Sequence, residues 1–71
     1  MNNEIKDLWF NIRHYGTIIN VLDQETEKGF YTYKYFIYDQ ERYVSMERNG
    51  QLLALQNCSE DKLIYDITEG E

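Results

Sequence analysis

Residues 43–55, YVSMERNGQLLAL, determine more of the fold than any other stretch of the chain. At its centre lies Asn49-Gly50, the dipeptide that best tolerates positive φ at both central positions of a type I′ turn. Apolar residues recur on both sides of this dipeptide. The pattern predicts a tight β-hairpin in which Arg48 faces Gln51.

Counting outward from the turn predicts which residues share a face of this hairpin. Met46 then faces Leu53 and Val44 faces Leu55, and directly opposed residues of an antiparallel pair lie on the same side of a sheet. One face is therefore wholly apolar, while the other is mixed. We expect the apolar face to contribute to the hydrophobic core.

The N-terminal segment has helical periodicity. Apolar residues recur at the spacing i, i+3, i+4, i+7, which is typical of an amphipathic helix: Ile5, Leu8, Trp9 and Ile12, with Tyr15 extending the stripe. Asn3 is the expected N-cap, because its side chain can accept a hydrogen bond from a free N–H of the first turn. Gly16 stands where a left-handed C-terminal cap belongs.

The segments that follow the helix are rich in β-branched and aromatic residues, which favour strands. Residues 17–22 and 30–38 predict two strands, and the charged connector 25–29 ends in Gly29, where a hairpin loop needs positive φ. Near the C-terminus, residues 59–67 alternate as a strand does but also suit a short helix. We favour a fifth strand for this segment.

Together these segments predict a single compact α+β domain, residues 1–71, in which one N-terminal helix packs on a four- or five-stranded antiparallel meander sheet. The tail, residues 69–71, has nothing to bury and is expected to fray. The expected core comprises Leu8, Trp9, Ile12, Ile19, Val21, Ile37, Val44, Met46, Leu53 and Leu55. A second sheet face, formed by Ile18, Leu22, Phe36 and Tyr38, needs the C-terminal segment or a partner to cover it.

Length and charge limit the classes of function. The chain has 71 residues, of which 13 are acidic and 7 basic, for a formal net charge of -6. Because so short a chain buries only about 60% of the surface that its unfolded form exposes, a wide catalytic cleft is hard to build. The single cysteine, Cys58, cannot close an intramolecular disulfide, and neither a signal peptide nor an apolar run of membrane-spanning length is present. We therefore expect a cytoplasmic protein without membrane association.

Residues that carry catalytic or metal chemistry are scarce. A structural zinc site needs four ligands, and the chain supplies one histidine, His14, and one cysteine. Asp23, Glu25 and Glu27 would share one face of an extended strand, but the calcium-loop pattern with its central glycine is missing. We predict no enzyme, no metal site and no cofactor. A small enzyme that uses Cys58 or His14 is the remaining alternative.

Tyrosines crowd the second predicted strand. Because side chains alternate, Tyr31, Tyr33 and Tyr35 form a ladder on a single face. The ladder suits either core packing or an exposed recognition patch, since tyrosine is enriched in protein interfaces. Single-strand nucleic-acid binders also use aromatic ladders, but they add a positive groove, which is the opposite of this chain's charge. We therefore expect no direct binding of nucleic acid.

Acidic residues gather in two regions, one in the first predicted hairpin and one near the C-terminus. Carboxylates spread along a compact surface can resemble nucleic-acid phosphates in spacing and occupy a basic groove. The expected partner is therefore a protein with a basic surface, such as a nucleic-acid enzyme. The expected partner-binding residues are Asp23, Glu25, Glu27, Tyr31, Tyr33, Tyr35, Glu60 and Asp61.

In size, charge and predicted architecture the chain resembles the small acidic inhibitors that bacteriophages and mobile elements encode, such as anti-CRISPR proteins and uracil-DNA glycosylase inhibitors. The resemblance covers the whole chain but includes no shared motif, so it assigns no role to any residue. It implies a non-enzymatic inhibitor or regulator, a DNA mimic that acts in the cytoplasm of a bacterial host. The alternative is a structural or accessory homodimer, in which a second copy covers the second sheet face and no inhibition occurs.

Overall fold

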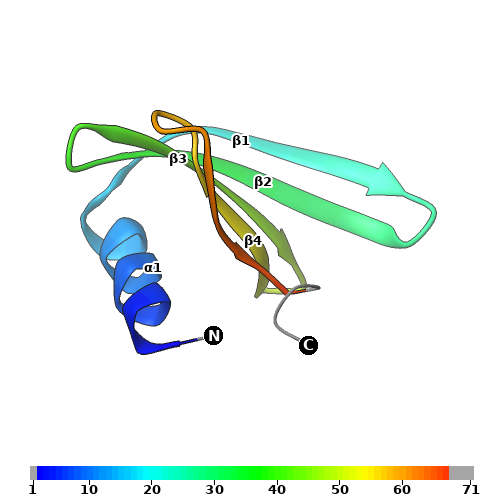
Figure 1. Ribbon diagram of the computed structural model, residues 1–71. Helices are drawn as coiled ribbons and strands as arrows, with labels where there is room; N and C mark the ends of the chain where they lie inside the picture. The colour runs from blue at the N-terminus through cyan, green and yellow to red at the C-terminus, as the bar shows by residue number, and fades with distance from the viewer. Residues whose placement is uncertain (1, 68–71) are drawn as a thin grey trace.

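A computed structural model of the protein describes residues 2–67 and shows one helix and a five-stranded antiparallel sheet (Figure 1). The elements are α1 (Asn3–Tyr15), β1 (Thr17–Thr26), β2 (Gly29–Tyr38), β3 (Glu41–Arg48), β4 (Gln51–Asn57) and β5 (Lys62–Asp66). The strands lie in the sheet in their sequence order, β1-β2-β3-β4-β5. The predicted α+β meander is confirmed, with β5 in the segment that also suited a helix. The predicted fraying of residues 69–71 lies outside the described residues.

Both ends of α1 are capped, although not as the sequence predicts. Asn2, rather than Asn3, is the N-cap: its Oδ1 accepts a hydrogen bond from the N–H of Ile5 (2.9 Å). Gly16 has an extended backbone (φ -76°, ψ 164°) instead of the left-handed conformation. Glycine is required here by close packing, because a Cβ would lie 2.5 Å from the carbonyl oxygen of Ile12.

Tight turns connect β1 to β2, β2 to β3 and β3 to β4. Asn49 and Gly50 both have positive φ (52° and 78°), which confirms the predicted turn. Asp39 and Gln40 occupy the same left-handed region (51° and 63°) in the turn between β2 and β3. Gly29 has a φ of 115°, as expected at the end of the first hairpin loop, although β1 runs further and the turn is shorter than predicted.

The pairing of β3 with β4 agrees with the prediction only beside the turn. Arg48 pairs with Gln51 as expected, but the register shifts at a bulge between Met46 and Glu47, where Leu53 is the extra residue of β4. An extra residue in one strand reverses the side of the sheet to which every later residue points.

Beyond the bulge, each residue of β3 pairs one position further along β4 than predicted. The observed pairs are Met46 with Ala54, Ser45 with Leu55 and Val44 with Gln56. The predicted pairs of Met46 with Leu53 and of Val44 with Leu55 are therefore wrong. As a result, Val44 and Met46 point to the opposite side of the sheet from Leu55.

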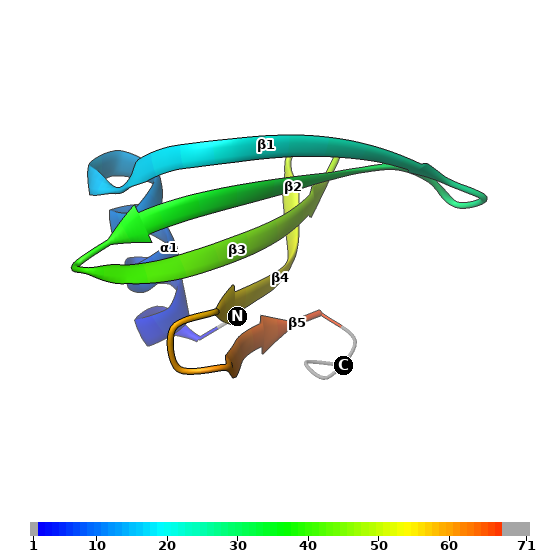
Figure 2. The same cartoon turned by 90° about the horizontal axis from the view of Figure 1, so that it is seen from above.

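One side of the sheet, which we call the helix side, is covered by α1 near the turn between β2 and β3 (Figure 1). Its buried apolar residues are Trp9, Ile12, Phe36, Tyr43, Leu52 and Leu55. The ring of Trp9 meets Phe36 edge-on, with centroids 5.7 Å apart and planes at 89°. Figure 2 shows α1 running across the strands at one end of the sheet, so the far part of the β1–β2 hairpin extends beyond it.

The strand residues of this core differ from the predicted ones. Trp9, Ile12 and Leu55 are buried as predicted, and Leu8 packs against them. The predicted core residues Ile19, Val21 and Ile37 are instead exposed, and Val44, Met46 and Leu53 are only half-buried. Three causes account for the errors: β1 is an edge strand that the helix leaves uncovered, Ile37 points to the side of β2 opposite Phe36, and the bulge turns the β3 residues away from α1.

The predicted second face is also wrong. Phe36 is 2% exposed beneath α1, and Tyr38 packs against the same core. On β1, Ile18 lies opposite Phe36 whereas Leu22 lies opposite Tyr33, because a second bulge separates them. These two residues therefore point to different sides of the sheet, and no single face holds the predicted set.

The close packing at Gly16 predicts that Gly16→Ala destabilises the protein more than Gly50→Ala does. Gly16→Ala is expected to lower the free energy of unfolding by about 2–3 kcal/mol, because its Cβ meets backbone atoms. Gly50→Ala is expected to lower it by about 1 kcal/mol, because φ is positive there but the space is open. Urea denaturation measures both values, and equal losses would contradict the packing role of Gly16.

The burial of Ser45 predicts that Ser45→Ala stabilises the protein, whereas both glycine substitutions destabilise it. Its Oγ is buried on the helix side and has no hydrogen-bond partner in the described part of the chain. Ser45→Ala is expected to raise the free energy of unfolding by about 1 kcal/mol, since an unsatisfied hydroxyl is removed. Asn57→Ala is the matched control, because Asn57 is buried but hydrogen-bonded, and it is expected to destabilise in the same urea denaturation. Destabilisation by Ser45→Ala would show that the hydroxyl has a partner.

Candidate interaction surface

The side of the sheet opposite α1, which we call the open face, has no other described segment over it (Figures 1 and 2). Alternation along β2 places Tyr31, Tyr33 and Tyr35 on this face, because Phe36 points to the helix side. The strand registers add Leu22 of β1, Val44 and Met46 of β3, Ala54 of β4 and Leu63 of β5. Polar residues such as Gln24, Gln56 and Asp66 share this face, so the tyrosines and aliphatic residues form an apolar patch within it.

The tyrosines of the ladder lie between residues of the two neighbouring strands. Tyr33 is opposite Leu22 on β1 and Met46 on β3, and Tyr35 is opposite Val44. Such packing leaves the tyrosine side chains half-buried. The ladder is thus held in place by its neighbours while one side of each residue stays accessible.

Three hollows follow the ladder across the open face. The central hollow, of about 240 Å³, is lined mainly by apolar atoms from Tyr33, Tyr35, Val44, Met46, Ala54 and Leu63, with Gln56. A second hollow, of about 350 Å³, lies between the same two tyrosines and Leu22, Asp23 and Gln24 of β1. The third, of about 430 Å³, is lined by Tyr31, Tyr33 and Met46 with Gln24, Thr26, Glu27 and Lys28. The side chains of a partner can fit into these hollows.

The helix side has a different character where α1 does not cover it. There Lys34 Nζ lies 3.0 Å from Glu47 Oε2. Nearby, Thr32 Oγ1 donates a hydrogen bond to Asp23 Oδ1 (2.8 Å). Val21 and Phe30 are exposed on this side beside the polar pairs, whereas the apolar side chains across the sheet line three adjoining hollows and form the kind of patch that marks an interaction site. The open face is therefore the candidate interaction surface.

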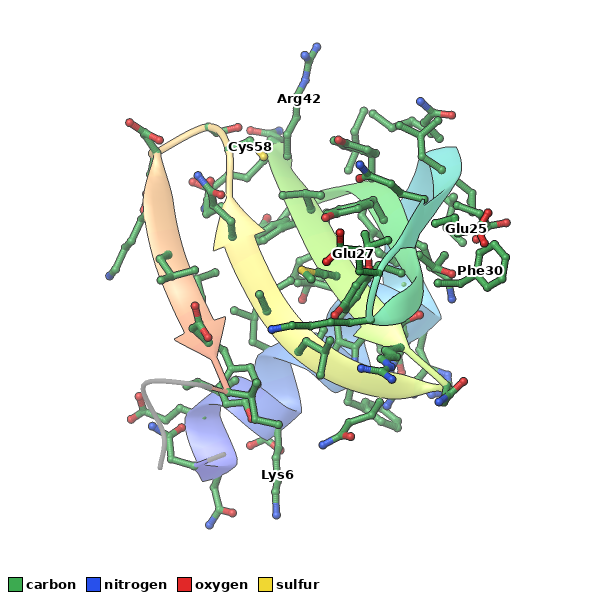
Figure 3. The ribbon with its side chains drawn as sticks, turned by 90° about the vertical axis from the view of Figure 1, so that its right-hand side faces the viewer. Lys6, Glu25, Glu27, Phe30, Arg42 and Cys58 are labelled. Atoms are coloured by element: carbon green, nitrogen blue, oxygen red, sulfur yellow. The ribbon has the colours of Figure 1, made fainter. Side chains whose placement is uncertain are left out.

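Of the acidic residues predicted to bind a partner, Glu27 lies with the tyrosines. Asp23 is opposite Thr32 and Glu25 is opposite Phe30, so both project to the helix side. Figure 3 shows Glu25 and Phe30 pointing together to one side of the hairpin and Glu27 to the other. Glu27 also lines the third hollow of the open face.

Glu60 and Asp61 lie at the other end of the sheet, in the loop between β4 and β5. Successive turns of a meander alternate between the two ends of the sheet, so this loop is opposite the Glu27 end. The N–H of Glu60 donates to Asn57 Oδ1 (3.0 Å), and Asp61 Oδ1 accepts from Gln56 Nε2 (3.4 Å). The eight predicted residues thus fall into three groups: the tyrosine ladder with Glu27, the pair Asp23 and Glu25, and the pair Glu60 and Asp61.

Beside this loop, Tyr43, Glu41 and Asn57 form a hydrogen-bonded cluster. The Tyr43 hydroxyl and Asn57 Nδ2 both donate to Oε2 of Glu41, each at 3.1 Å. Burial, together with the Glu41 carboxylate, raises the pKa of Tyr43 to about 12. The hydroxyl therefore keeps its proton at neutral pH and acts as a donor. A hollow of about 400 Å³ beside the cluster extends to the first turns of α1.

The other residues with catalytic or metal-binding chemistry lie away from the open face. His14 is in the last turn of α1, with its ring centroid 4.1 Å from that of Phe10. Cys58 is exposed in the loop between β4 and β5. Within residues 2–67, no group of three or more His, Cys, Asp or Glu side chains is placed to hold a metal ion. Over the same range, α1 is too short and too polar to cross a membrane.

Comparisons of the chain with protein-family models, with curated proteins and with solved structures find no match. The functional assignment therefore depends on the geometry and charge of the molecule itself.

The tyrosines of the open face are predictable from strand alternation, but its aliphatic residues are not. Val44 and Met46 are predicted in the core, because counting from the turn assumes an uninterrupted ladder. The sequence carries one signal at the bulge: Leu52 and Leu53 are adjacent large apolar residues, which interrupts the period-2 alternation of the strand. This signal is sufficient to question the register but not to choose between the two faces.

The raised pKa of Tyr43 predicts a loss of stability at high pH. The folded state holds this proton up to about pH 12, whereas the unfolded state releases it near pH 10. The stability that Tyr43 contributes is therefore complete below pH 10 and is lost as the pH rises toward 12. Urea denaturation on both sides of pH 10 is expected to show a smaller decline for Tyr43→Phe than for the wild type. Equal declines would contradict the assignment.

Proposed function

We propose that the protein is a non-enzymatic inhibitor or regulator that binds a protein partner through its open face and blocks a basic site on a nucleic-acid-processing protein. The observation that carries this proposal is the half-buried ladder of Tyr31, Tyr33 and Tyr35 on the face that α1 leaves bare. Tyrosine offers rigid amphipathic contact area, and its immobilisation costs little entropy because packing on the sheet already restricts it.

The open face has the distribution of apolar and polar residues that is usual in a protein interface. Its centre, around Tyr33 and Met46, is apolar and hollowed. Polar and charged residues lie toward the hairpin tip, where the guanidinium of Arg48 stands 5.8 Å from the ring centroid of Tyr31 and Glu27 lines the hollow. An apolar centre with a polar rim is the usual arrangement of a specific interface.

Net charge supports a basic partner. At -6, the chain attracts a positively charged surface at long range and repels a nucleic acid. Glu27 lines the third hollow with Lys28 and is the acidic residue that we expect to contact the partner, while Asp23 and Glu25 on the helix side contribute to the long-range field. The aromatic patch then supplies short-range affinity, and the acidic charge supplies steering and selectivity.

The test is capture by immobilised protein from a lysate of the cells that encode it, using matched variants. We expect a basic nucleic-acid-processing protein to be retained by the wild type and to be lost with Tyr33→Ser combined with Met46→Ser. Phe10→Ser is the control, because Phe10 is a 48% exposed aromatic residue of α1, outside the open face. The retained protein, once purified, is expected to be inhibited by the wild type and by Phe10→Ser only. Retention of it by the open-face variant would contradict the proposed surface.

A second pair of variants tests the role of charge. Capture is expected to weaken as salt rises, because exposed charges are screened beyond about 10 Å at 0.1 M salt. Glu27→Gln is expected to weaken capture several-fold more than Glu25→Gln, although both remove one charge from the same hairpin. Salt-independent capture, or equal effects of the two variants, would contradict the placement of Glu27 at the interface.

A further inference from the structure

β1 is a long edge strand. It is first in the sheet order and so pairs with a neighbour on one side only, and all ten of its residues are exposed. The other edge, β5, has five residues. Short strands, bulges, proline and charged residues are the usual features that keep an edge strand from pairing with another chain. Apart from one bulge, the first six residues of β1, TIINVL, contain none of these features.

The aliphatic residues of this segment are exposed on both sides of the sheet. Ile18, Ile19, Val21 and Leu22 are 52%, 50%, 48% and 48% exposed. Removing such apolar surface from water stabilises an association. Uncharged segments with high β-propensity and without glycine or proline also pair readily with their own copies.

We infer that two copies of the chain pair through residues 17–22 of β1, antiparallel and related by a two-fold axis perpendicular to the sheet. In this register Ile18 of one copy faces Val21 of the other, and Thr17 faces Leu22. Because of the bulge, Ile18 and Val21 both point to the helix side, while Thr17 and Leu22 both point to the open face. Opposed side chains therefore meet on the same side of the sheet, as pairing requires; a strand without the bulge would place them on opposite sides.

Charge favours antiparallel over parallel pairing. Asp23 and Glu25 follow the paired segment and project to the helix side. Antiparallel pairing directs them toward the end of α1 in the other copy, whose last turn carries the positive charge of Arg13. Parallel pairing would set the acidic residues of the two copies next to each other. Opposite charges across a strand pair stabilise it, and like charges destabilise it.

The paired state differs from the face-to-face homodimer that the sequence suggests as an alternative. A perpendicular two-fold axis leaves both open faces pointing the same way, so the dimer presents two tyrosine ladders on one continuous sheet. Pairing must displace one local bond, which the N–H of Val21 donates to Asn20 Oδ1 (2.9 Å). Since the paired segment is short, we expect association that depends on concentration in the micromolar range. Pairing of two copies through β1 does not require that the open face bind a partner.

Sedimentation equilibrium tests the pairing. The mass of the wild type is expected to rise with concentration from 8.6 kDa toward twice that value. Val21→Lys places a charge in the paired segment and is expected to remain monomeric. Because Val21 is exposed in the monomer, the substitution leaves the fold intact. Gln24→Lys adds the same charge beyond the segment and is expected to behave as the wild type. A wild type that stays monomeric, or a Val21→Lys variant that dimerises equally, would overturn the inference.

Disulfide trapping tests the register. Directly opposed residues of antiparallel strands have Cα atoms about 4.5–5.5 Å apart, within reach of a disulfide. In a Cys58→Ser background, mixing the Ile18→Cys and Val21→Cys variants is expected to give a mixed disulfide in clear excess over homodisulfides. Mixing Ile18→Cys with Gln24→Cys is expected to give no such excess. Homodisulfides of Ile18→Cys as the main product would indicate parallel pairing and overturn the register.

Discussion

The structure depends on the contact between one helix and one end of one side of the sheet. Ile12 and Leu55 are fully buried in this contact, and Trp9 packs edge-on against Phe36. A helix about 10 Å wide that crosses the strands covers only a band of their length, whereas a ten-residue strand extends about 33 Å. The other side of the sheet, the far part of the first hairpin and the β1 edge are therefore left without cover from α1 (Figures 1 and 2).

The elements of the fold follow from local signals, and the assignment of faces does not. Helical spacing, the Asn49-Gly50 turn and β-branched composition predict the helix, the sheet and its meander order, because each depends on neighbours in sequence. Which residues lie beneath α1 depends on three inserted residues, one in β1, Leu53 in β4 and Ile64 in β5. A single insertion reverses the face of every residue beyond it, so Val44 and Met46 lie on the other side of the sheet from Leu55, with which they are predicted to share a face. No local signal is strong enough to place such a bulge with certainty.

The residues of the candidate surface also divide into those that local sequence signals predict and those whose position depends on strand pairing. The tyrosines on one face of β2 are predictable, because they belong to one strand with no bulge among them. The joining of these tyrosines with Glu27, and the separation of Asp23 and Glu25 from them, depend on pairing between strands. Glu60 and Asp61 lie at the opposite end because of the meander topology. Residues that are similar in charge and near in sequence can thus belong to different surfaces of the molecule.

The central claim is that α1 covers the Phe36 side of the sheet and leaves the tyrosine side open. Solvent paramagnetic relaxation in the NMR spectrum of the free protein measures this directly, because a soluble paramagnetic agent relaxes the protons that it can approach. We predict strong relaxation of the Met46 methyl and the Tyr33 ring, and weak relaxation of the Phe36 ring and the Leu55 methyls. Protection of Met46 and Tyr33 with strong relaxation of Phe36 would show that the faces are reversed, and would contradict the account.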